Sequence, residues 1–105
     1  MSEEKSVIEW TLQGEKAKLT PVTVSEATLR KYTGTYGTSK ITFDNGALYY
    51  QRTVPKYRLL PMTQTIFFLE GRDSIRVEFV VEGGKVKELV GSYDDGRREP
   101  SQRTR

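Results

Sequence analysis

Residues 39–52 read SKITFDNGALYYQR, and this stretch decides the fold. Its Asn45-Gly46 pair lies between two segments rich in aromatic and branched residues. Asn-Gly is the pair most favoured in a two-residue type I′ turn, because both central residues of that turn need a positive φ. A turn of this length fixes the register of the two strands. It predicts three cross-strand pairs: Asp44 with Ala47, Phe43 with Leu48, and Ile41 with Tyr50.

That register gives the hairpin one apolar face and one polar face. The large apolar side chains share one side: Ile41, Phe43, Leu48 and Tyr50. Because side chains alternate along a strand, a slip of one residue would turn this whole set towards water. The turn and the hydrophobic pattern therefore agree on a half-buried antiparallel hairpin.

A second hairpin is predicted around Gly83-Gly84. Residues 75–81 alternate between apolar and polar side chains, as a strand with one buried face does. A two-residue turn predicts these pairs: Glu82 with Lys85, Val81 with Val86, and Val77 with Val90. The same register would place Glu88 opposite Phe79 on the apolar face. We therefore expect a bulge near Glu88, or a position for it at the open rim of the sheet.

Further strands are predicted on both sides of these hairpins. Residues 57–60 form a short strand between two prolines. Residues 65–69, TIFFL, are apolar on both faces, which indicates a strand that is covered on both sides or lies at the closing edge of a barrel. The last strand should end near Tyr93, because the Asp-Asp-Gly sequence at 94–96 is typical of a turn or terminus.

Two helices are predicted before the sheet. Residues 3–19 can form an amphipathic helix with a narrow apolar stripe, made of Val7, Ile8, Leu12 and Leu19. Gly14 weakens this helix by about 1 kcal/mol relative to alanine, and the alternation at 8–12 would also suit a strand. Ser25 is a favourable N-cap for a short helix from Glu26 to about Lys31, which would seat against the sheet as a plug.

These elements predict one mainly β domain with one or two short helices. About six or seven short strands form an antiparallel meander, which is stable when it curls into a barrel or half-barrel with the N-terminal helix packed against it. We divide the chain into an N-terminal helix and linker at 1–22, the β domain at 23–96, and a disordered basic tail at 97–105. The expected core consists of Ile41, Phe43, Leu48, Tyr50, Leu59, Phe68, Val77, Phe79 and Val90.

The composition fits a small globular protein and argues against a nucleic-acid binder. The chain has 105 residues, of which 35% are hydrophobic and 30% are charged, with a net charge of +3. Four arginines and one glutamate in residues 97–105 account for this whole excess, so we expect no basic face on the folded part. No apolar run approaches the roughly 20 residues of a membrane-spanning helix, and we expect no membrane insertion.

The residue types restrict the chemistry that this chain can perform. Cysteine and histidine are both absent, which excludes disulfides within the chain, thiolate or imidazole metal sites, and triads that use histidine. Asp94, Asp95 and Glu99 show neither the spacing of a calcium loop nor a carboxylate pair placed across a cleft. We therefore expect no catalytic, cofactor-binding or metal-binding residue.

Two places are candidates for contact with a partner. The N-terminal element carries Ile8, Trp10 and Leu12, and these side chains need something to lie on. Their partner is the sheet of this domain, a neighbouring domain, or a second copy of the chain in a homodimer. Tyr49, on the polar face of the central hairpin, is a candidate for an exposed aromatic patch.

Three segments carry a family resemblance: LRKYTGTY at 29–36, ITFDNGALYYQR at 41–52 and KYRLLP at 56–61. Together they are similar to the small β-rich domain at the C-terminus of bacterial tail-specific (C-terminal-processing) serine peptidase family proteins. Similar tails follow β-lactamase-related serine hydrolases. Residues 8–12 through 21–23 look like the end of the peptidase domain's last helix and its link to the tail, and residues 91–98 look like the usual ending of the tail.

The resemblance implies a non-catalytic accessory domain of an exported serine peptidase-like protein, located in the bacterial periplasm or cell envelope. In that family the catalytic serine and lysine lie in the upstream catalytic domain, so no catalytic residue carries over to this chain. The catalytic domain of the parent protein is then the expected partner. The alternative is a lipocalin-like barrel that encloses a small apolar ligand, although the many large side chains favour a filled interior.

Overall fold

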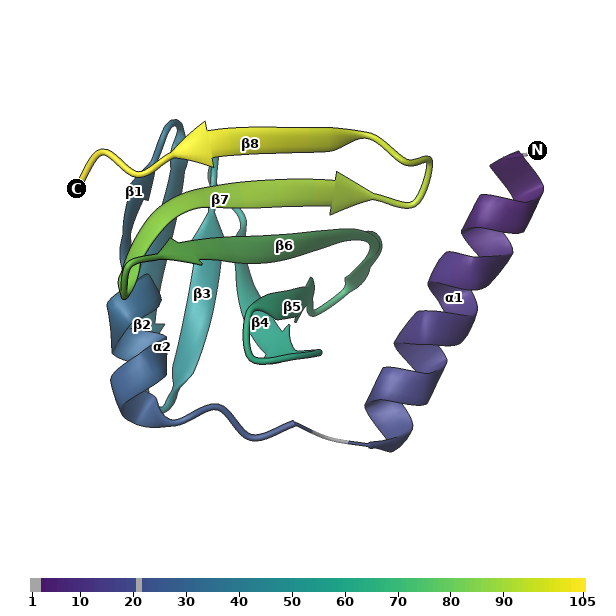
Figure 1. Cartoon of the computed structure of the whole chain (residues 1–105), viewed down its shortest axis with the longest axis horizontal. Coiled ribbons are helices and arrows are strands. Elements are labelled where there is room, and N and C mark those ends of the chain that lie inside the picture. The colour runs from purple at the N-terminus through teal and green to yellow at the C-terminus, as the bar shows by residue number, and fades with distance from the viewer. Residues whose placement is uncertain (1–2, 21) are drawn as a thin grey trace.

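The described part of the chain runs through two helices and then eight strands, which form one curled sheet (Figure 1). This computed structural model describes residues 3–20 and 22–105, with side chains from residue 8 onwards, so the predicted linker position Pro21 lies outside the described residues. The helices are α1 (Glu3–Leu19) and α2 (Glu26–Tyr32), at the two predicted places. The strands are β1 (Gly34–Tyr36), β2 (Ser39–Asp44), β3 (Ala47–Gln51), β4 (Lys56–Pro61), β5 (Ile66–Leu69), β6 (Arg72–Glu82), β7 (Lys85–Tyr93) and β8 (Arg98–Gln102).

The sheet is an antiparallel meander that curls into a nearly closed barrel. Each strand pairs with its neighbours in chain order, from β1 to β8, which confirms the predicted topology. The segment after β8 returns to β1, where Tyr36 forms an antiparallel bridge with Arg103. The Thr104 N–H donates to the Thr35 carbonyl at 2.8 Å, and the Thr35 N–H donates to the Arg105 carbonyl at 3.3 Å. The barrel has eight strands rather than the predicted six or seven.

The prediction of a disordered tail at 97–105 is wrong, because most of this segment is strand β8. Its ladder with β7 runs from the pair Ser92 and Arg98 to the pair Glu88 and Gln102. The side chains of β8 are mostly exposed, so its sequence lacks the alternation that marks a half-buried strand. Pairing uses backbone N–H and C=O groups, and the edge of β7 offers these whatever side chains β8 carries. The β domain therefore extends beyond the predicted boundary at residue 96.

The central hairpin has the predicted turn and register. Asn45 has a φ of 53° and Gly46 a φ of 83°, as a type I′ turn requires. The structure contains the three predicted pairs: Asp44 with Ala47, Phe43 with Leu48, and Ile41 with Tyr50. Leu48 is buried and Phe43 packs against the core, which confirms the apolar face.

The second hairpin contains the predicted bulge, and the bulge corrects the pairing beyond it. The first pairs are as predicted: Glu82 with Lys85 and Val81 with Val86. An extra residue in β7 then shifts the register, so that Val77 faces the residue after the predicted Val90. The shift also places Leu89 instead of Glu88 opposite Phe79. A carboxylate would be costly to bury at that position, and the bulge turns it to the outer face.

Aromatic side chains fill the interior of the barrel. The rings of Tyr32 and Phe79 stack with centroids 4.2 Å apart and an angle of 1° between their planes. Phe67 and Tyr36 meet Phe79 edge-on, with centroids at 5.6 and 5.9 Å. The Tyr36 hydroxyl donates to the Tyr32 carbonyl at 2.8 Å, so the polar end of this fully buried side chain is satisfied.

Most of the predicted core is confirmed, with two exceptions that lie on the outer face. Five predicted residues belong to the core cluster, and two pack against it: Ile41, Leu48, Leu59, Val77 and Phe79, then Phe43 and Tyr50. Phe68 is buried but alternates with core residues along β5, so it points outwards, beneath α1. Val90 is buried on the outer face because the bulge in β7 turns it there. The run at 65–69 is thus covered on both sides.

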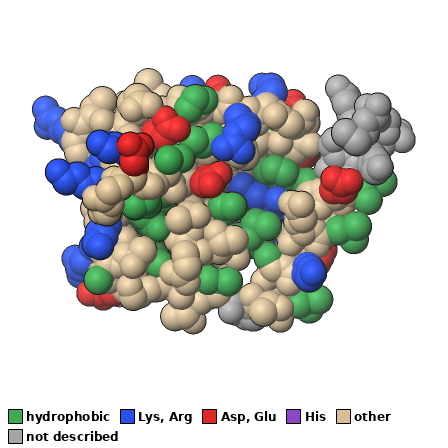
Figure 2. Space-filling model, in the orientation of Figure 1, with side chains coloured by type: hydrophobic (Ala, Val, Ile, Leu, Met, Phe, Trp, Pro, Cys, Tyr) green, Lys and Arg blue, Asp and Glu red, His purple; other side chains and the backbone are tan. Residues whose placement is uncertain are grey.

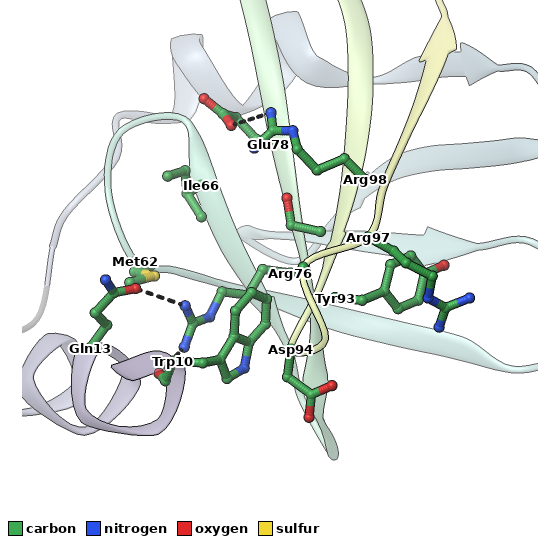
Figure 3. Close-up of a pocket in the computed structure, with 12 residues that line it drawn as sticks. Trp10, Gln13, Met62, Ile66, Arg76, Glu78, Tyr93, Asp94, Arg97 and Arg98 are labelled. Atoms are coloured by element: carbon green, nitrogen blue, oxygen red, sulfur yellow. Dashed lines mark hydrogen bonds and ion pairs between the residues drawn. The ribbon is translucent and has the colours of Figure 1, made fainter. Parts of the chain in front are cut away.

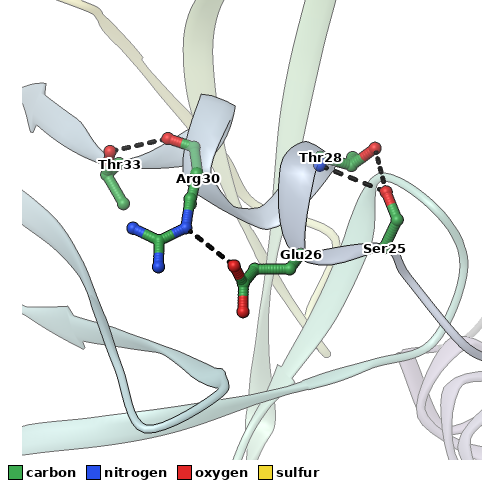
Figure 4. A network of polar contacts seen from close by, with 5 residues as sticks. All are labelled: Ser25, Glu26, Thr28, Arg30 and Thr33. Atoms are coloured by element: carbon green, nitrogen blue, oxygen red, sulfur yellow. Dashed lines mark hydrogen bonds and ion pairs between the residues drawn. The ribbon is translucent and has the colours of Figure 1, made fainter.

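Helix α2 lies against one end of the barrel, as the predicted plug (Figure 1). Ser25 is its N-cap and accepts a hydrogen bond from the Thr28 N–H at 3.2 Å (Figure 4). Arg30 pairs with Glu26 at 3.1 Å, and the Thr33 hydroxyl donates to the Arg30 carbonyl at 2.7 Å. The buried residues of this helix are Leu29 and Tyr32.

Candidate functional site

Helix α1 packs against the outside of the barrel with the face opposite to its apolar stripe. Ile8, Leu12 and Leu19 are 58%, 63% and 84% exposed. At about 100° per residue, these three side chains fall within an arc of about 40°. Trp10 and Gly14 lie on the other side of the helix and contact β5 and β6. The stripe therefore faces away from the barrel.

The contact between α1 and the barrel centres on Arg76. Strand β6 presents this residue on its outer face, opposite Phe68 on β5. Arg76 is only 5% exposed, and its guanidinium carbon lies 3.7 Å from the centroid of the Trp10 ring. Its Nη2 donates to the Trp10 carbonyl at 2.6 Å, and its Nη1 reaches Gln13 Oε1 at 3.5 Å. A single cation thus holds one turn of α1.

Gly14 makes this close approach possible. A Cβ at this position would lie 3.0 Å from Arg76 Nη2 and 3.7 Å from the Phe68 ring. The first distance is shorter than an ordinary contact, so any larger residue would push the guanidinium group away. The glycine that weakens the helix in isolation therefore leaves room for the cation that fastens it.

Arg76 is buried without a carboxylate bound to it among the described residues. Burial lowers the pKa of Arg76, and the negative charge of Asp73 offsets part of that effect. The Asp73 carboxylate lies beside Lys18 instead, at 3.9 Å, while the Asp73 carbonyl accepts from Trp10 Nε1 at 2.8 Å. Within the described part of the chain, the buried Nε of Arg76 has no hydrogen-bond partner. The indole face and neutral oxygens compensate part of the positive charge.

A groove of about 300 Å³ lies between α1 and the outer face of the barrel, and Arg76 lines it. Figure 2 shows the hollow from outside, with a basic surface at its floor and hydrophobic surfaces beside it. The apolar part of its wall is formed by Trp10, Met62 and Ile66 (Figure 3). A cation below and an apolar wall beside it make the groove amphiphilic.

The other charged residues around the groove are largely occupied or turned away. Arg98 Nη2 lies 3.5 Å from the Glu78 carboxylate. The Asp94 carboxylate points away from the Arg76 guanidinium group in Figure 3. Arg97 pairs with the carboxylate of the neighbouring Asp95 at 2.8 Å. Among the described residues that line this groove, Arg76 is thus the cation without a bound carboxylate.

A second, smaller cavity of about 120 Å³ lies inside the barrel where β2 begins and β7 ends. Ser39 is buried there, and its hydroxyl donates to the Tyr50 oxygen at 3.2 Å. A hydrogen bond with Glu99 raises the pKa of Tyr93, and burial adds to this effect. The cavity has room for a few water molecules of about 30 Å³ each. It is small beside ligand pockets, which have about 300–1,000 Å³.

The structure separates the four candidate interface residues into three places. Ile8 and Leu12 lie on the exposed stripe of α1. Trp10 points from α1 towards the outer face of the barrel, where its ring stacks on Arg76. Tyr49 lies on β3 with Lys56 Nζ 5.4 Å from its ring centroid, and β4 separates it from β5, on which α1 lies.

Sequence reasoning missed Arg76, the residue on which the groove depends. In the alternation of 75–81 it reads as an ordinary polar residue on the solvent face. The available signal was Phe68, which points outwards from a strand that is apolar on both faces. A covered Phe68 requires a cover over its cross-strand neighbour too, and that neighbour is Arg76.

The described residues offer few other chemical groups. In the ranges 3–20 and 22–105, no three acidic side chains gather closely enough to hold a metal ion. None of the helices in these ranges has the length and apolar character to cross a membrane. Hydrogen bonds from the backbone and side chain of Arg97 lower the pKa of Asp95, so this exposed carboxylate serves a local turn.

Comparison with known proteins found no match for this chain: no family model, no curated protein and no solved structure is similar to it. Membership of the peptidase family therefore stays a proposal, which depends on the resemblance in residues 29–36, 41–52 and 56–61. The arguments for function come from the groove, the exposed stripe and the filled barrel.

Proposed function

We propose that this chain is a non-catalytic interaction domain that binds a neighbouring folded domain through α1. The observation that carries the proposal is the exposed stripe formed by Ile8, Leu12 and Leu19. Hydrophobic side chains gather on the side of α1 away from the barrel (Figure 2). Covering apolar surface stabilises an interface by about 25 cal/mol per Å². The entropy and desolvation costs of association reduce this gain. A helix already held on the barrel presents that surface in a fixed orientation.

The partner that we favour is the catalytic domain of a serine peptidase-like parent protein. The segments 29–36, 41–52 and 56–61 support this choice through their family resemblance. They supply the second half of α2 with β1, most of the central hairpin, and strand β4, so the likeness concerns the frame of the barrel. The absence of histidine from the chain fits an accessory role. The proposal includes export and a bacterial periplasmic or cell-envelope setting for the parent.

The filled interior favours an interaction domain over the lipocalin-like alternative. The stacked rings of Tyr32 and Phe79, with Phe67 against them, occupy the space that an enclosed apolar ligand would need. The cavity at the other end, of about 120 Å³, is lined in part by Ser39 and Glu99. Polar groups there suit water better than a fatty acid.

The decisive experiment measures binding between the purified chain and the peptidase domain encoded in the same reading frame, by isothermal titration calorimetry. The paired substitutions Ile8→Glu and Leu12→Glu should weaken binding by at least about tenfold, because each puts a charge into an apolar contact. Lys40→Glu is the matched control, since it changes the charge of an exposed residue on β2, away from α1.

Three results would contradict the proposal. One is a reading frame without a peptidase-like domain, and another is binding that survives both stripe substitutions. The third is saturable one-to-one uptake of a fluorescent fatty-acid probe into the barrel, which would favour the lipocalin-like alternative. Sedimentation of the chain alone tests the homodimer: self-association that Leu12→Glu abolishes would show that a second copy covers the stripe.

A further inference from the structure

We propose that the groove between α1 and the barrel binds a small amphiphilic carboxylate, with its carboxylate on Arg76 and its apolar part on Trp10, Met62 and Ile66. The inference is independent of the proposed partner domain, because it concerns the side of α1 that faces the barrel. It rests on the buried cation, on its weak acceptors and on the shape and lining of the groove.

The first step is the state of the Arg76 guanidinium group. Burying an ionised group without a counter-ion is unfavourable, and a buried donor without an acceptor adds to that penalty. Arg76 is 5% exposed, its Nε has no partner within the described residues, and no carboxylate there is bonded to it. The indole face of Trp10 at 3.7 Å is a partial substitute for an anion.

The second step is an exchangeable hydrogen bond. Arg76 Nη1 lies 3.5 Å from Gln13 Oε1, which is at the long limit for a hydrogen bond. A carboxylate oxygen forms a shorter, charge-assisted bond to the same donor. A ligand that moves the Gln13 amide aside therefore gains more at Arg76 than it displaces.

The third step is the wall beside the cation. Trp10, Met62 and Ile66 give the ligand an apolar surface, in a groove of about 300 Å³. This volume is at the lower end for small-molecule sites. The Glu78 carboxylate near the groove is paired with Arg98, so its repulsion of a ligand anion is reduced. The site suits a carboxylate group attached to a short apolar chain.

Two sources can supply this chemistry: a free short-chain carboxylic acid, or the carboxyl end of a peptide with an apolar last residue. Trp10 is the only tryptophan of the chain, and it stacks on the guanidinium group that would bind the carboxylate. Its fluorescence therefore reports directly on ligand entry.

Two pairs of probes distinguish the sources. The first pair is hexanoate and its neutral analogue hexanol, and the second is N-acetylleucine and its neutral analogue N-acetylleucinamide.

Titration of the full chain should give a saturable change in Trp10 fluorescence with at least one of the two carboxylates. The corresponding neutral analogue should bind roughly tenfold more weakly, because it lacks the charge-assisted bond. Binding of hexanoate identifies a free acid as the source, and binding of N-acetylleucine alone identifies a peptide end. Amide shifts in a ¹⁵N NMR titration should be largest at Gln13, Arg76 and Ser92, around the groove.

Arg76→Met keeps the apolar stem and removes the charge, and it should weaken carboxylate binding by roughly tenfold or more. Arg58→Met is the matched control, because Arg58 is exposed on β4. If Arg76→Met loosens α1, the ¹⁵N NMR titration of the unmodified chain still tests the proposal, because it locates the ligand without any substitution. No saturable binding of either carboxylate, equal binding of the neutral analogue, undiminished binding to Arg76→Met, or shifts centred away from the groove would each overturn the proposal.

Discussion

A chain that ends at Arg97 should lose the contacts that bring the two edges of the barrel together, and with them most of the stability of the domain. Three backbone hydrogen bonds join residues 103–105 to the barrel: Thr104 to Thr35 at 2.8 Å, Arg103 to Lys87 at 2.9 Å, and Thr35 to Arg105 at 3.3 Å. At about 1 kcal/mol each, they contribute about 3 kcal/mol. Arg103 Nη2 also donates to the Thr33 carbonyl at 2.7 Å. A hydrogen bond from a charged group contributes about 1.5–3 kcal/mol.

The sum is about 5 kcal/mol before the ladder between β7 and β8 is counted. Small domains are stable by about 5–15 kcal/mol. The truncated chain should therefore unfold at a much lower urea concentration than the full chain, or without a cooperative transition. Circular dichroism and Trp10 fluorescence measure the unfolding together.

Two point variants make the test finer. Arg103→Ala removes the side-chain bond to Thr33 and should lower stability by about 2 kcal/mol, a shift of the melting temperature on the order of 10 °C. Arg105→Ala removes the same charge from the same terminus, but the contacts that close the barrel use its backbone carbonyl, so it should change stability by less than about 0.5 kcal/mol. Equal urea midpoints for the truncated and full chains would refute this reasoning and restore a solvated tail at 97–105.

Other parts of the barrel give further predictions. Phe79→Ala removes the ring on which Tyr32 stacks and should cost about 3–5 kcal/mol in urea denaturation, against less than about 1 kcal/mol for the outer residue Tyr49→Ala. Burial raises the pKa of Tyr36 to about 12, against an unfolded value near 10. The folded chain thus holds this proton more tightly, and the stability that it contributes is complete below about pH 10 and is lost as the pH rises from about 10 to about 12. Urea midpoints across that range should fall less steeply for Tyr36→Phe, and an identical slope would contradict the assignment. Gly46→Ala should cost about 1–2 kcal/mol through its φ of 83° alone, since no atom lies within 4 Å of the added Cβ. Gly91→Ala, without a positive φ and with a nearest atom at 3.8 Å, should change the urea midpoint much less.

The bulge in β7 shows how far side-chain pattern alone can predict a register. A carboxylate at Glu88 conflicts with a regular pairing against Phe79, and the sequence contains both residues, so the conflict was visible without a structure. Its consequence, that Val90 moves to the outer face, depends on which residue is left unpaired. Several places for the extra residue would relieve the same conflict, and the packing of Leu89 inside the barrel selects among them.

The groove was beyond the reach of pattern analysis for a related reason. Arg76 and Phe68 each alternate with core residues along their strands, which places both side chains on the outer face of the barrel. Nothing in the neighbouring sequence indicates that α1 covers them. The sequence left open whether the stripe of Ile8, Leu12 and Leu19 meets the sheet of this domain, a neighbouring domain or a second copy. The helix meets the sheet through Trp10 and Gly14, because the Trp10 ring and the space left by Gly14 accommodate the guanidinium group of Arg76.

By itself, the sequence determined the local geometry: the turn at Asn45-Gly46, the hairpin register beside it, the cap at Ser25 and the antiparallel meander. These depend on backbone preferences and side-chain alternation over a few residues. Only the tertiary structure decided that the segment after β8 returns to β1 and that Arg76 is buried under α1. Both outcomes join residues far apart in the chain through backbone groups or a single side chain, and such contacts leave no periodic trace in the sequence.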